Sequence, residues 1–236
     1  MKILLQAGPV LVVLGEATHR DLRFDARNEL DLQALAEDSG WTGSVRVAEQ
    51  VHGVRILSAG DDGCGDAFLL GQDEAAAVRI ADCWPVVVAD PSRARAVVAH
   101  CGWRGAAGGL AGASVRRLLQ EGSRPDDLVA CIGPGIQVAS FEVGQEVAAA
   151  FPESVHGSTA WGTPSVDLER FLAAQLNAAG VPDSAIVRDH RDSFLDPDLH
   201  SHRRDAAHAG RMACLCIVRK VGTISLEDRF HPKEHP

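Results

Sequence analysis

The apolar positions of this chain form short runs that alternate with segments of helical periodicity. Runs of this length bounded by turn residues are typical of strands buried in a sheet. On this pattern we predict strands at 10–14, 45–51, 75–80, 85–90, 94–100, 128–132, 185–189 and 211–219. Because helical segments separate several of these strands, the pattern indicates an α/β architecture.

Helix-end residues mark the segments between the strands. A helix is predicted to follow the small residues after Gly105 and to end near Glu121. Asp167 is a predicted N-cap for a helix that runs through Ala179 and ends at Gly180. The other predicted helices are 28–38 and 143–151.

No internal repeat, low-complexity tract or linker divides the sequence, so we expect one domain over residues 1–236, with mixed β-sheets flanked by helices. Residues 218–236 are predicted to form a polar tail. The apolar N-terminal segment is split by Gly8-Pro9, which favours two short strands around a turn over a signal peptide. No apolar run reaches transmembrane length, and we expect a cytoplasmic protein.

Composition narrows the class of partner. Hydrophobic residues make up 46% of the chain and charged residues 23%, which is ordinary for a globular protein. The formal net charge of -9 disfavours nucleic acid and anionic membranes as partners, so a small anionic substrate needs a local cluster of cations. Six cysteines are too few for a disulfide scaffold in a chain of 236 residues, which fits a reducing compartment.

Three segments place reactive side chains where regular structure is predicted to break. They are Glu49-Gln50-Val51-His52-Gly53, Ala81-Asp82-Cys83-Trp84-Pro85 and His100-Cys101-Gly102-Trp103-Arg104-Gly105. Strand ends that face loops are the usual place for a site in α/β proteins.

As possible metal ligands, these segments offer two imidazoles and one thiolate, from His52, His100 and Cys83. Zinc with three protein ligands and an open fourth position is the catalytic pattern, whereas structural zinc uses four protein ligands. The spacings of 31 and 17 residues are too long for a local chelating motif. The residues alone therefore leave open that Cys83 is a small buried hydrophobe and that the histidines satisfy loop hydrogen bonds.

The third segment also contains a glycine-rich helix start with Arg104 beside it. Small residues let a ligand approach the backbone, and a helix N-terminus favours an anion, so a phosphate could bind there with Arg104 as its charged partner. Tight packing of the helix on the sheet explains the same glycines, and the local sequence leaves both readings open.

Together these segments resemble the purine nucleoside phosphorylase family formerly called multicopper polyphenol oxidase or laccase-domain protein. The resemblance covers residues 45–218. Further matching segments follow in family order: Ile132-Gly133-Pro134-Gly135-Ile136, Phe141-Glu142-Val143-Gly144, Asp167-Leu168, Ser201-His202-Arg203-Arg204-Asp205 and Gly210-Arg211-Met212-Ala213.

The resemblance implies a zinc ion, with copper the less favoured metal, at the positions of His52, Cys83 and His100. It implies phosphorolysis of adenosine, inosine, guanosine or methylthioadenosine, with adenosine deamination as a second activity. The partners would then be a nucleoside and phosphate, and a monomer and a homodimer both remain open. The implied α/β fold resembles the catalytic domain of bacterial glutamine-deamidating toxins.

Roles for other residues follow from the implied chemistry. In phosphorolysis, phosphate attacks the anomeric carbon and needs cations, while the leaving base needs a proton or an electrophile. Arg104 is the first phosphate candidate. Asp82 and Glu142 are acid–base candidates, although Asp82 could instead orient a ligand histidine. Cys83 is grouped with these two carboxylates as catalytic, and the remaining substrate or phosphate candidates are Gln50, Arg203, Arg204 and Arg211.

The sequence departs from the family pattern at several points. Cys101 replaces the usual alanine, and because side chains alternate along a strand we expect it to face away from the site. His202 replaces a tyrosine, and a cysteine expected near Asp189 is absent. The N-terminal family pattern is shortened around Arg20–Asn28.

Three alternative functions use the same residues. Cys83 could be the nucleophile of a hydrolase or deamidase, with His100 or His52 as base. A zinc-stabilised binding module would have the metal without turnover. A copper-dependent polyphenol oxidase is disfavoured, because coupled copper centres need several His-x-His pairs and this chain has only His200-Ser201-His202.

Overall fold

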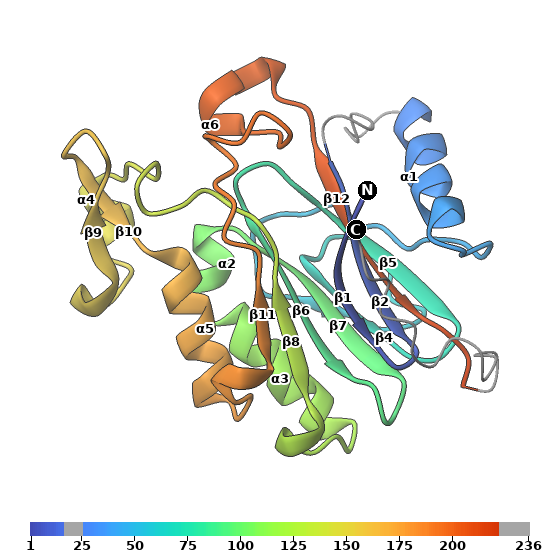
Figure 1. The fold of residues 1–236 in the computed structure, drawn as a ribbon. Coiled ribbons are helices and arrows are strands. Elements are labelled where there is room, and N and C mark those ends of the chain that lie inside the picture. The colour runs from blue at the N-terminus through green and yellow to red at the C-terminus, as the bar shows by residue number, and fades with distance from the viewer. Residues whose placement is uncertain (17–25, 222–236) are drawn as a thin grey trace, which may run out of the picture.

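Two β-sheets lie face to face in the computed structural model, which describes residues 1–16 and 26–221, and helices cover the outer face of each sheet (Figure 1). The first sheet is antiparallel. Its four strands are, in spatial order, β1 (Lys2–Ala7), β2 (Val10–Gly15), β12 (Met212–Val218) and β5 (Glu74–Ile80). The N-terminal segment therefore forms two paired strands, as Gly8-Pro9 predicted.

The second sheet has six strands and is mixed. It runs in the order β11 (Ile186–Arg188), β8 (Val129–Ile132), β6 (Trp84–Asp90), β7 (Arg95–Cys101), β4 (Ala67–Leu70) and β3 (Ile56–Leu57). The two outer pairs are parallel and the inner ones antiparallel. A separate hairpin of β9 (His156–Ser158) and β10 (Pro164–Val166) projects beside it.

The helices lie on opposite outer faces of the two sheets (Figure 1). Helix α1 (Ala26–Asp38) covers the four-stranded sheet, while α3 (Leu110–Gln120) and α5 (Leu168–Ala178) cover the six-stranded sheet. The short helices are α2 (Trp103–Ala107), α4 (Gln145–Ala148) and α6 (His202–Asp205). No helix in the described part of the chain is long and apolar enough to span a membrane.

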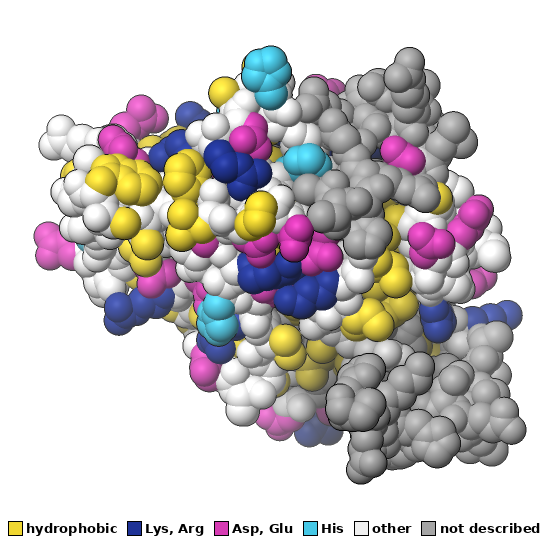
Figure 2. All heavy atoms as spheres, turned by 45° about the horizontal axis from the view of Figure 1, so that its top comes forward, with side chains coloured by type: hydrophobic (Ala, Val, Ile, Leu, Met, Phe, Trp, Pro, Cys, Tyr) yellow, Lys and Arg dark blue, Asp and Glu magenta, His cyan; other side chains and the backbone are white. Residues whose placement is uncertain are grey.

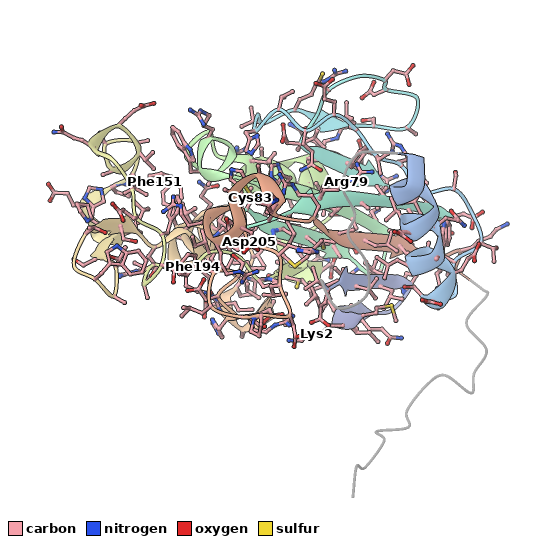
Figure 3. The ribbon with its side chains drawn as sticks, turned by 90° about the horizontal axis from the view of Figure 1, so that it is seen from above. Lys2, Arg79, Cys83, Phe151, Phe194 and Asp205 are labelled. Atoms are coloured by element: carbon pink, nitrogen blue, oxygen red, sulfur yellow. The ribbon has the colours of Figure 1, made fainter. Side chains whose placement is uncertain are left out.

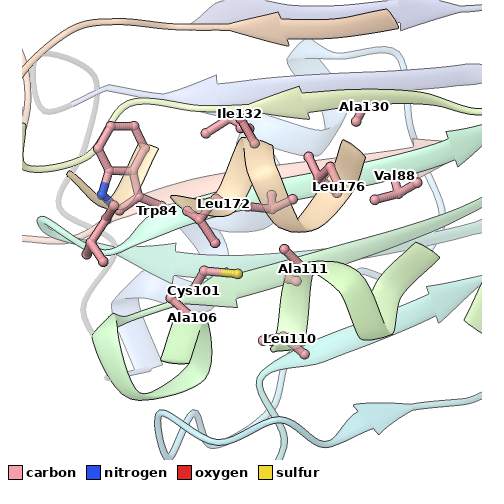
Figure 4. Packing of buried hydrophobic residues seen from close by; sticks show 14 of the residues in the cluster. Trp84, Val88, Cys101, Ala106, Leu110, Ala111, Ala130, Ile132, Leu172 and Leu176 are labelled. Atoms are coloured by element: carbon pink, nitrogen blue, oxygen red, sulfur yellow. The ribbon is translucent and has the colours of Figure 1, made fainter. Parts of the chain in front are cut away.

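Alternating side chains divide the core into layers. On β6, Val87 and Ala89 pack between the two sheets, while Val86 and Val88 pack against the helices. Both faces of this strand are buried, which explains why its sequence is continuously apolar. Cys101 faces the helical layer, next to Ala106 and Ala111, as its position on the strand predicted (Figure 4).

Most predicted strands and helices are confirmed, and the mixed sheets of one α/β domain agree with the sequence pattern. The strand predicted at 45–51 is wrong: this segment is a loop with isolated bridges at Arg46 and Glu49. The helix predicted at 143–151 is reduced to α4, because the chain turns tightly before Pro152. The helix after Gly105 is divided into α2 and α3 at Gly109, whose φ is 83°.

Some sequence expectations cannot be compared with the structure. Most of the segment around Arg20–Asn28, and all but the first residues of the predicted polar tail, lie outside the described residues. On the face shown in Figure 2, basic side chains lie beside acidic ones. Two of the ion pairs of the protein are Arg191 with Asp189, at 2.8 Å, and Lys2 with Asp189, at 3.1 Å.

Candidate metal centre

The structure brings His52, Cys83 and His100 together. One ligand atom from each residue lies within 4.8 Å of the others, and this is the one group of potential metal ligands found among the described residues. His100 is buried, Cys83 is half-buried and His52 is exposed, so the group opens outward. The fold thus brings side chains that are far apart in the sequence to one place, and their role as metal ligands stays a prediction.

Three separate connections deliver these side chains. His52 lies in the loop before β3, Cys83 in the tight turn between β5 and β6, and His100 near the end of β7, where it pairs with Pro85. The turn before Cys83 places Asp82 at a φ of 81°, a left-handed conformation that few side chains adopt. The β6–β7 hairpin thus fixes the distance between the thiol and the buried imidazole.

Gln50 anchors the loop that carries His52. Its amide nitrogen donates to the carbonyl oxygen of Arg79 at 2.8 Å, and its amide oxygen accepts from the Arg79 backbone N–H at 2.7 Å. The side chain therefore replaces a neighbouring strand at this point of β5. Gln50 also lines the cavity beside the cluster, and its contact with substrate stays a prediction.

Asp66 is the carboxylate that contacts a histidine of the cluster. Its Oδ1 lies 2.9 Å from Nδ1 of His100, and its side chain is fully buried. Burial opposes ionisation of Asp66, but the hydrogen bonds from His100 and from the backbone N–H of Gly53 outweigh it, and the pKa of the carboxyl is below its ordinary value. Nothing in the local sequence marks Asp66, which lies 34 residues from His100.

The thiol and the buried imidazole shift each other's ionisation. Burial alone would raise the pKa of Cys83, but the charge of His100 and hydrogen bonds from both histidines outweigh it and lower the pKa to about 6. Burial alone would lower the pKa of His100, but Cys83 and Asp66 raise it to about 9. A thiolate is therefore available at neutral pH, and thiolate is the form of cysteine that binds metals and acts as a nucleophile.

The donor set fits zinc. Thiolate and imidazole are ligands that zinc prefers, and three protein ligands leave a position for water or substrate. The second thiol, Cys101, does not join them: burial raises its pKa strongly, and it packs in the helical layer of the core.

The cluster opens into a cavity of about 430 Å³, and two of its lining residues, Cys83 and Arg79, are labelled in Figure 3. Ile136 and Phe141 give it an apolar wall, and Arg79, Arg203 and Arg211 give it positive charge. The full set of lining residues is Gln50, His52, Arg79, Ala81, Asp82, Cys83, His100, Ile136, Phe141, His202, Arg203 and Arg211.

Sequence reasoning missed Arg79. This residue is 6% exposed and lies near the end of β5, where it was counted as part of a buried apolar strand. The available signal was a guanidinium in an otherwise apolar run, because a buried arginine is rare and usually has a specific partner or ligand.

Asp82 lines the cavity but does not orient a histidine. Its carboxylate accepts a hydrogen bond from Ser193 Oγ at 2.7 Å and another from the backbone N–H of Arg203 at 2.6 Å. These bonds tie the turn that carries Cys83 to the loop at Ser193 and to the beginning of α6. The carboxylate in contact with His100 is that of Asp66 and not that of Asp82.

Glu142 and Arg203 lie beside the aromatic wall. The guanidinium of Arg203 donates to the carbonyl oxygen of Glu142 at 2.9 Å and lies over the ring of Phe141. The carboxylate of Glu142 accepts from the indole N–H of Trp161 at 3.0 Å and is not part of the cavity lining. Arg203 therefore faces the site, whereas the carboxylate of Glu142 is turned toward the β9–β10 hairpin.

The other two predicted arginines do not line the cavity. Arg104 is exposed on α2, with its guanidinium carbon 4.1 Å from the centre of the Trp103 ring. Arg204 donates to four backbone carbonyl groups of the preceding loop and to Asp205. The carbonyl groups belong to Ser193, Phe194, Asp196 and Leu199.

Residues 25–219 match the family described as multi-copper polyphenol oxidoreductase laccase, and the chain belongs to this family. A purine nucleoside phosphorylase from Deinococcus radiodurans is 36% identical over 182 residues, which are 73% of this chain and 70% of that protein. The crystal structure of YlmD from Geobacillus stearothermophilus superposes with a TM-score of 0.80 and 27% identity, over 90% of this chain and 93% of that one.

A further relative is the adenosine deaminase RL5 from an unknown prokaryotic organism. It is 36% identical over 142 residues, which cover 57% of this chain and 54% of that protein. The family resemblance inferred from the motifs is thus confirmed. The relatives named purine nucleoside phosphorylase and adenosine deaminase support the prediction that this chain is an enzyme.

Proposed function

We propose that this chain is a purine nucleoside phosphorylase whose metal, zinc, is held by His52, Cys83 and His100. The observation that carries the proposal is one cavity lined by all three residues and by three arginines. A relative at 36% identity over most of the chain bears the phosphorylase name. When bound, zinc supplies a Lewis acid in the open part of the site.

The cavity has the two kinds of wall that a nucleoside and phosphate require. Phe141 and Ile136 offer an apolar surface on which a purine can pack. Arg79, Arg203 and Arg211 offer guanidinium groups, which suit a phosphate oxyanion and neutralise it as it attacks the anomeric carbon. Arg104 and Arg204 remain predictions as phosphate ligands.

The leaving base must gain a proton or an equivalent positive charge as the ribosyl–base bond breaks. Asp82 is in the cavity and is the better placed of the two predicted carboxylates, while Glu142 would have to rotate away from Trp161. His202 is exposed in the same cavity and is a further proton donor.

Adenosine deamination is the second activity that we propose, on the strength of the relative named adenosine deaminase. It needs a water activated next to the purine, and the open side of the ligand group offers the place for it. A location in the cytoplasm, and a monomeric or homodimeric state, remain predictions.

A second candidate function is hydrolysis or deamidation with Cys83 as nucleophile. One observation favours it: Cys83, His100 and Asp66 follow one another in the order thiolate, imidazole, carboxylate, which is the arrangement of a nucleophilic triad. The expected likeness to deamidating toxins belongs to this candidate and remains a prediction. No further cluster of potential copper ligands is found among the described residues, so nothing in them adds support to the copper oxidase alternative.

One experiment separates these functions. Zinc-loaded and chelator-treated protein are incubated with adenosine, inosine, guanosine and methylthioadenosine, with and without phosphate, and free base and ammonia are measured. We expect base release that requires both zinc and phosphate. If the zinc-loaded protein released neither free base nor ammonia, the proposal would be refuted. Iodoacetamide labelling of Cys83 that zinc does not block, with activity surviving chelation, would favour the nucleophile.

A further inference from the structure

We propose that Asp66 is the positioning residue of this site and that it holds both histidine ligands in place through one buried carboxylate. The residue lies directly before β4, in the six-stranded sheet. Its side chain is fully buried beneath the loop that carries His52 and beside the strand that carries His100. The inference rests on the proposed function only in assuming that the cluster binds a metal.

The first half of the inference concerns the His52 loop. The Asp66 carboxylate accepts backbone N–H groups from three consecutive residues: Val51 at 3.2 Å, His52 at 2.9 Å and Gly53 at 2.7 Å. His52 has a φ of 60°, in the left-handed region that non-glycine residues rarely occupy. Three bonds to one anion stabilise this conformation and thereby fix the direction in which the His52 side chain leaves the loop.

The second half concerns His100. The Asp66 carboxylate lies 2.9 Å from Nδ1 of His100, and the Asp66 carbonyl oxygen accepts the His100 backbone N–H at 2.7 Å. A carboxylate at Nδ1 requires the proton there, so the lone pair of a neutral ring is at Nε2, which is then the ligand atom. Asp66 therefore holds both the backbone and the ring of His100.

A carboxylate is needed here because all the hydrogen bonds of the side chain come from N–H donors. An asparagine has the same size and shape, but it has one accepting oxygen and would turn its NH₂ group toward at least one of these N–H groups. Burial makes such a mismatch costly. The Asp66→Asn change is therefore expected to disturb both histidines while leaving the rest of the core packing intact.

Asp90 provides a matched control. It is likewise a fully buried aspartate, at the far end of β6, and it accepts bonds from Ser92 and from the backbone of Arg93. Asp90→Asn thus tests the loss of a buried charge in the same sheet without touching the cluster.

The experiment measures zinc affinity of the full chain by competition with a chromogenic chelator, and melting temperature with and without zinc. We expect Asp66→Asn to weaken zinc binding by about 10–100-fold, the effect typical of losing an outer partner of a ligand histidine. The rise in melting temperature caused by zinc should shrink accordingly. Asp90→Asn should keep the affinity of the wild type and the full rise, even if its melting temperature without zinc is lower.

Wild-type affinity in Asp66→Asn would overturn the inference, and so would an equal loss in both variants. If Asp66→Asn does not fold, the imidazole nitrogens of zinc-loaded wild-type protein labelled with ¹⁵N-histidine provide the answer. We expect His100 to be protonated at Nδ1, and protonation at Nε2 would overturn the inference. Wild-type protein that binds no zinc would refute the metal site and this inference together, whereas zinc binding without phosphorolysis would refute only the proposed function.

Discussion

Gly102 lies so close to His52 that a Cβ atom at this position would be 2.7 Å from Cδ2 of the imidazole. The same atom would lie 3.1 Å from Sγ of Cys83. Real Cβ atoms are almost never found at the shorter of these distances, so the two ligands occupy space that only a glycine leaves open. The glycine after β7 is thus part of the architecture of the site and not only of the helix start.

We therefore predict that Gly102→Ala displaces His52 or Cys83 and weakens zinc binding, with little change in the remainder of the fold. Zinc affinity and the far-UV circular dichroism spectrum check this expectation. Gly144→Ala is the control, because no heavy atom lies within 4 Å of a Cβ at that position. Equal affinities in the two variants would contradict the prediction.

Among these substitutions, removal of the Cys83 thiol should weaken zinc binding the most. Cys83→Ala takes away one of three protein ligands, so we expect a loss of zinc affinity greater than the about 10–100-fold caused by loss of an outer partner. Zinc content after dialysis and nucleoside phosphorolysis provide the two readouts. Cys64→Ala is the matched control, since this thiol lies outside the ligand group. A Cys83→Ala protein that retained zinc would exclude the ligand set.

Substituting the arginines one at a time and measuring the KM for phosphate should show which of them bind phosphate. Arg79 and Arg211 line the cavity, whereas Arg104 is exposed and stacks on Trp103. Hydrogen bonds to charged groups contribute about 1.5–3 kcal/mol, so Arg79→Gln and Arg211→Gln should each raise the KM for phosphate by about 10–100-fold. Arg104→Gln should change it much less. The opposite order, measured at saturating nucleoside, would restore the phosphate role that the sequence assigned to Arg104.

The ionisation of Cys83 predicts a pH profile for the chelator-treated protein. The pKa of this thiol is lowered to about 6, so the thiolate forms as pH rises through about 6 and not near 9. The rate of alkylation by iodoacetamide, followed at Cys83 by mass spectrometry, should therefore rise with a midpoint near pH 6. His100→Gln removes the nearby positive charge and should move this midpoint upward. A midpoint near 9 in the wild type would contradict the prediction.

The same pair should have little effect on the pH dependence of stability. The Cys83 pKa is lowered from 9.0 to about 6, so its stabilisation is complete above pH 9 and is lost as pH falls toward 6. The His100 pKa is raised from 6.5 to about 9, so its stabilisation is complete below pH 6.5 and is lost as pH rises toward 9. Between pH 6.5 and 9 the contributions of Cys83 and His100 to stability change in opposite directions. Melting temperatures measured across this window should therefore show little effect of this pair.

The sequence by itself determined the elements whose signals are local. The continuous apolar runs gave β5, β6, β7 and β12, because strands buried on both faces cannot contain alternating polar residues. Asp167 was predicted as an N-cap, and its side chain accepts the backbone N–H of Arg170. The short strands β3 and β4 have too few residues to show a period and were missed.

For the site, the motifs identified which residues meet, but only the tertiary structure decided what surrounds them. His52, Cys83 and His100 are marked by breaks in regular structure, and the family resemblance connects them. Asp66 carries no such local mark, and Arg79 is marked only as a guanidinium in an apolar run, because the roles of both depend on which strands become neighbours in the two sheets. Likewise, a glycine-rich helix start favoured Arg104, whereas in the structure its guanidinium lies over the Trp103 ring and does not line the cavity. Local periodicity encodes strands and helices, while the partners of a buried charge are set by contacts between residues far apart in the chain.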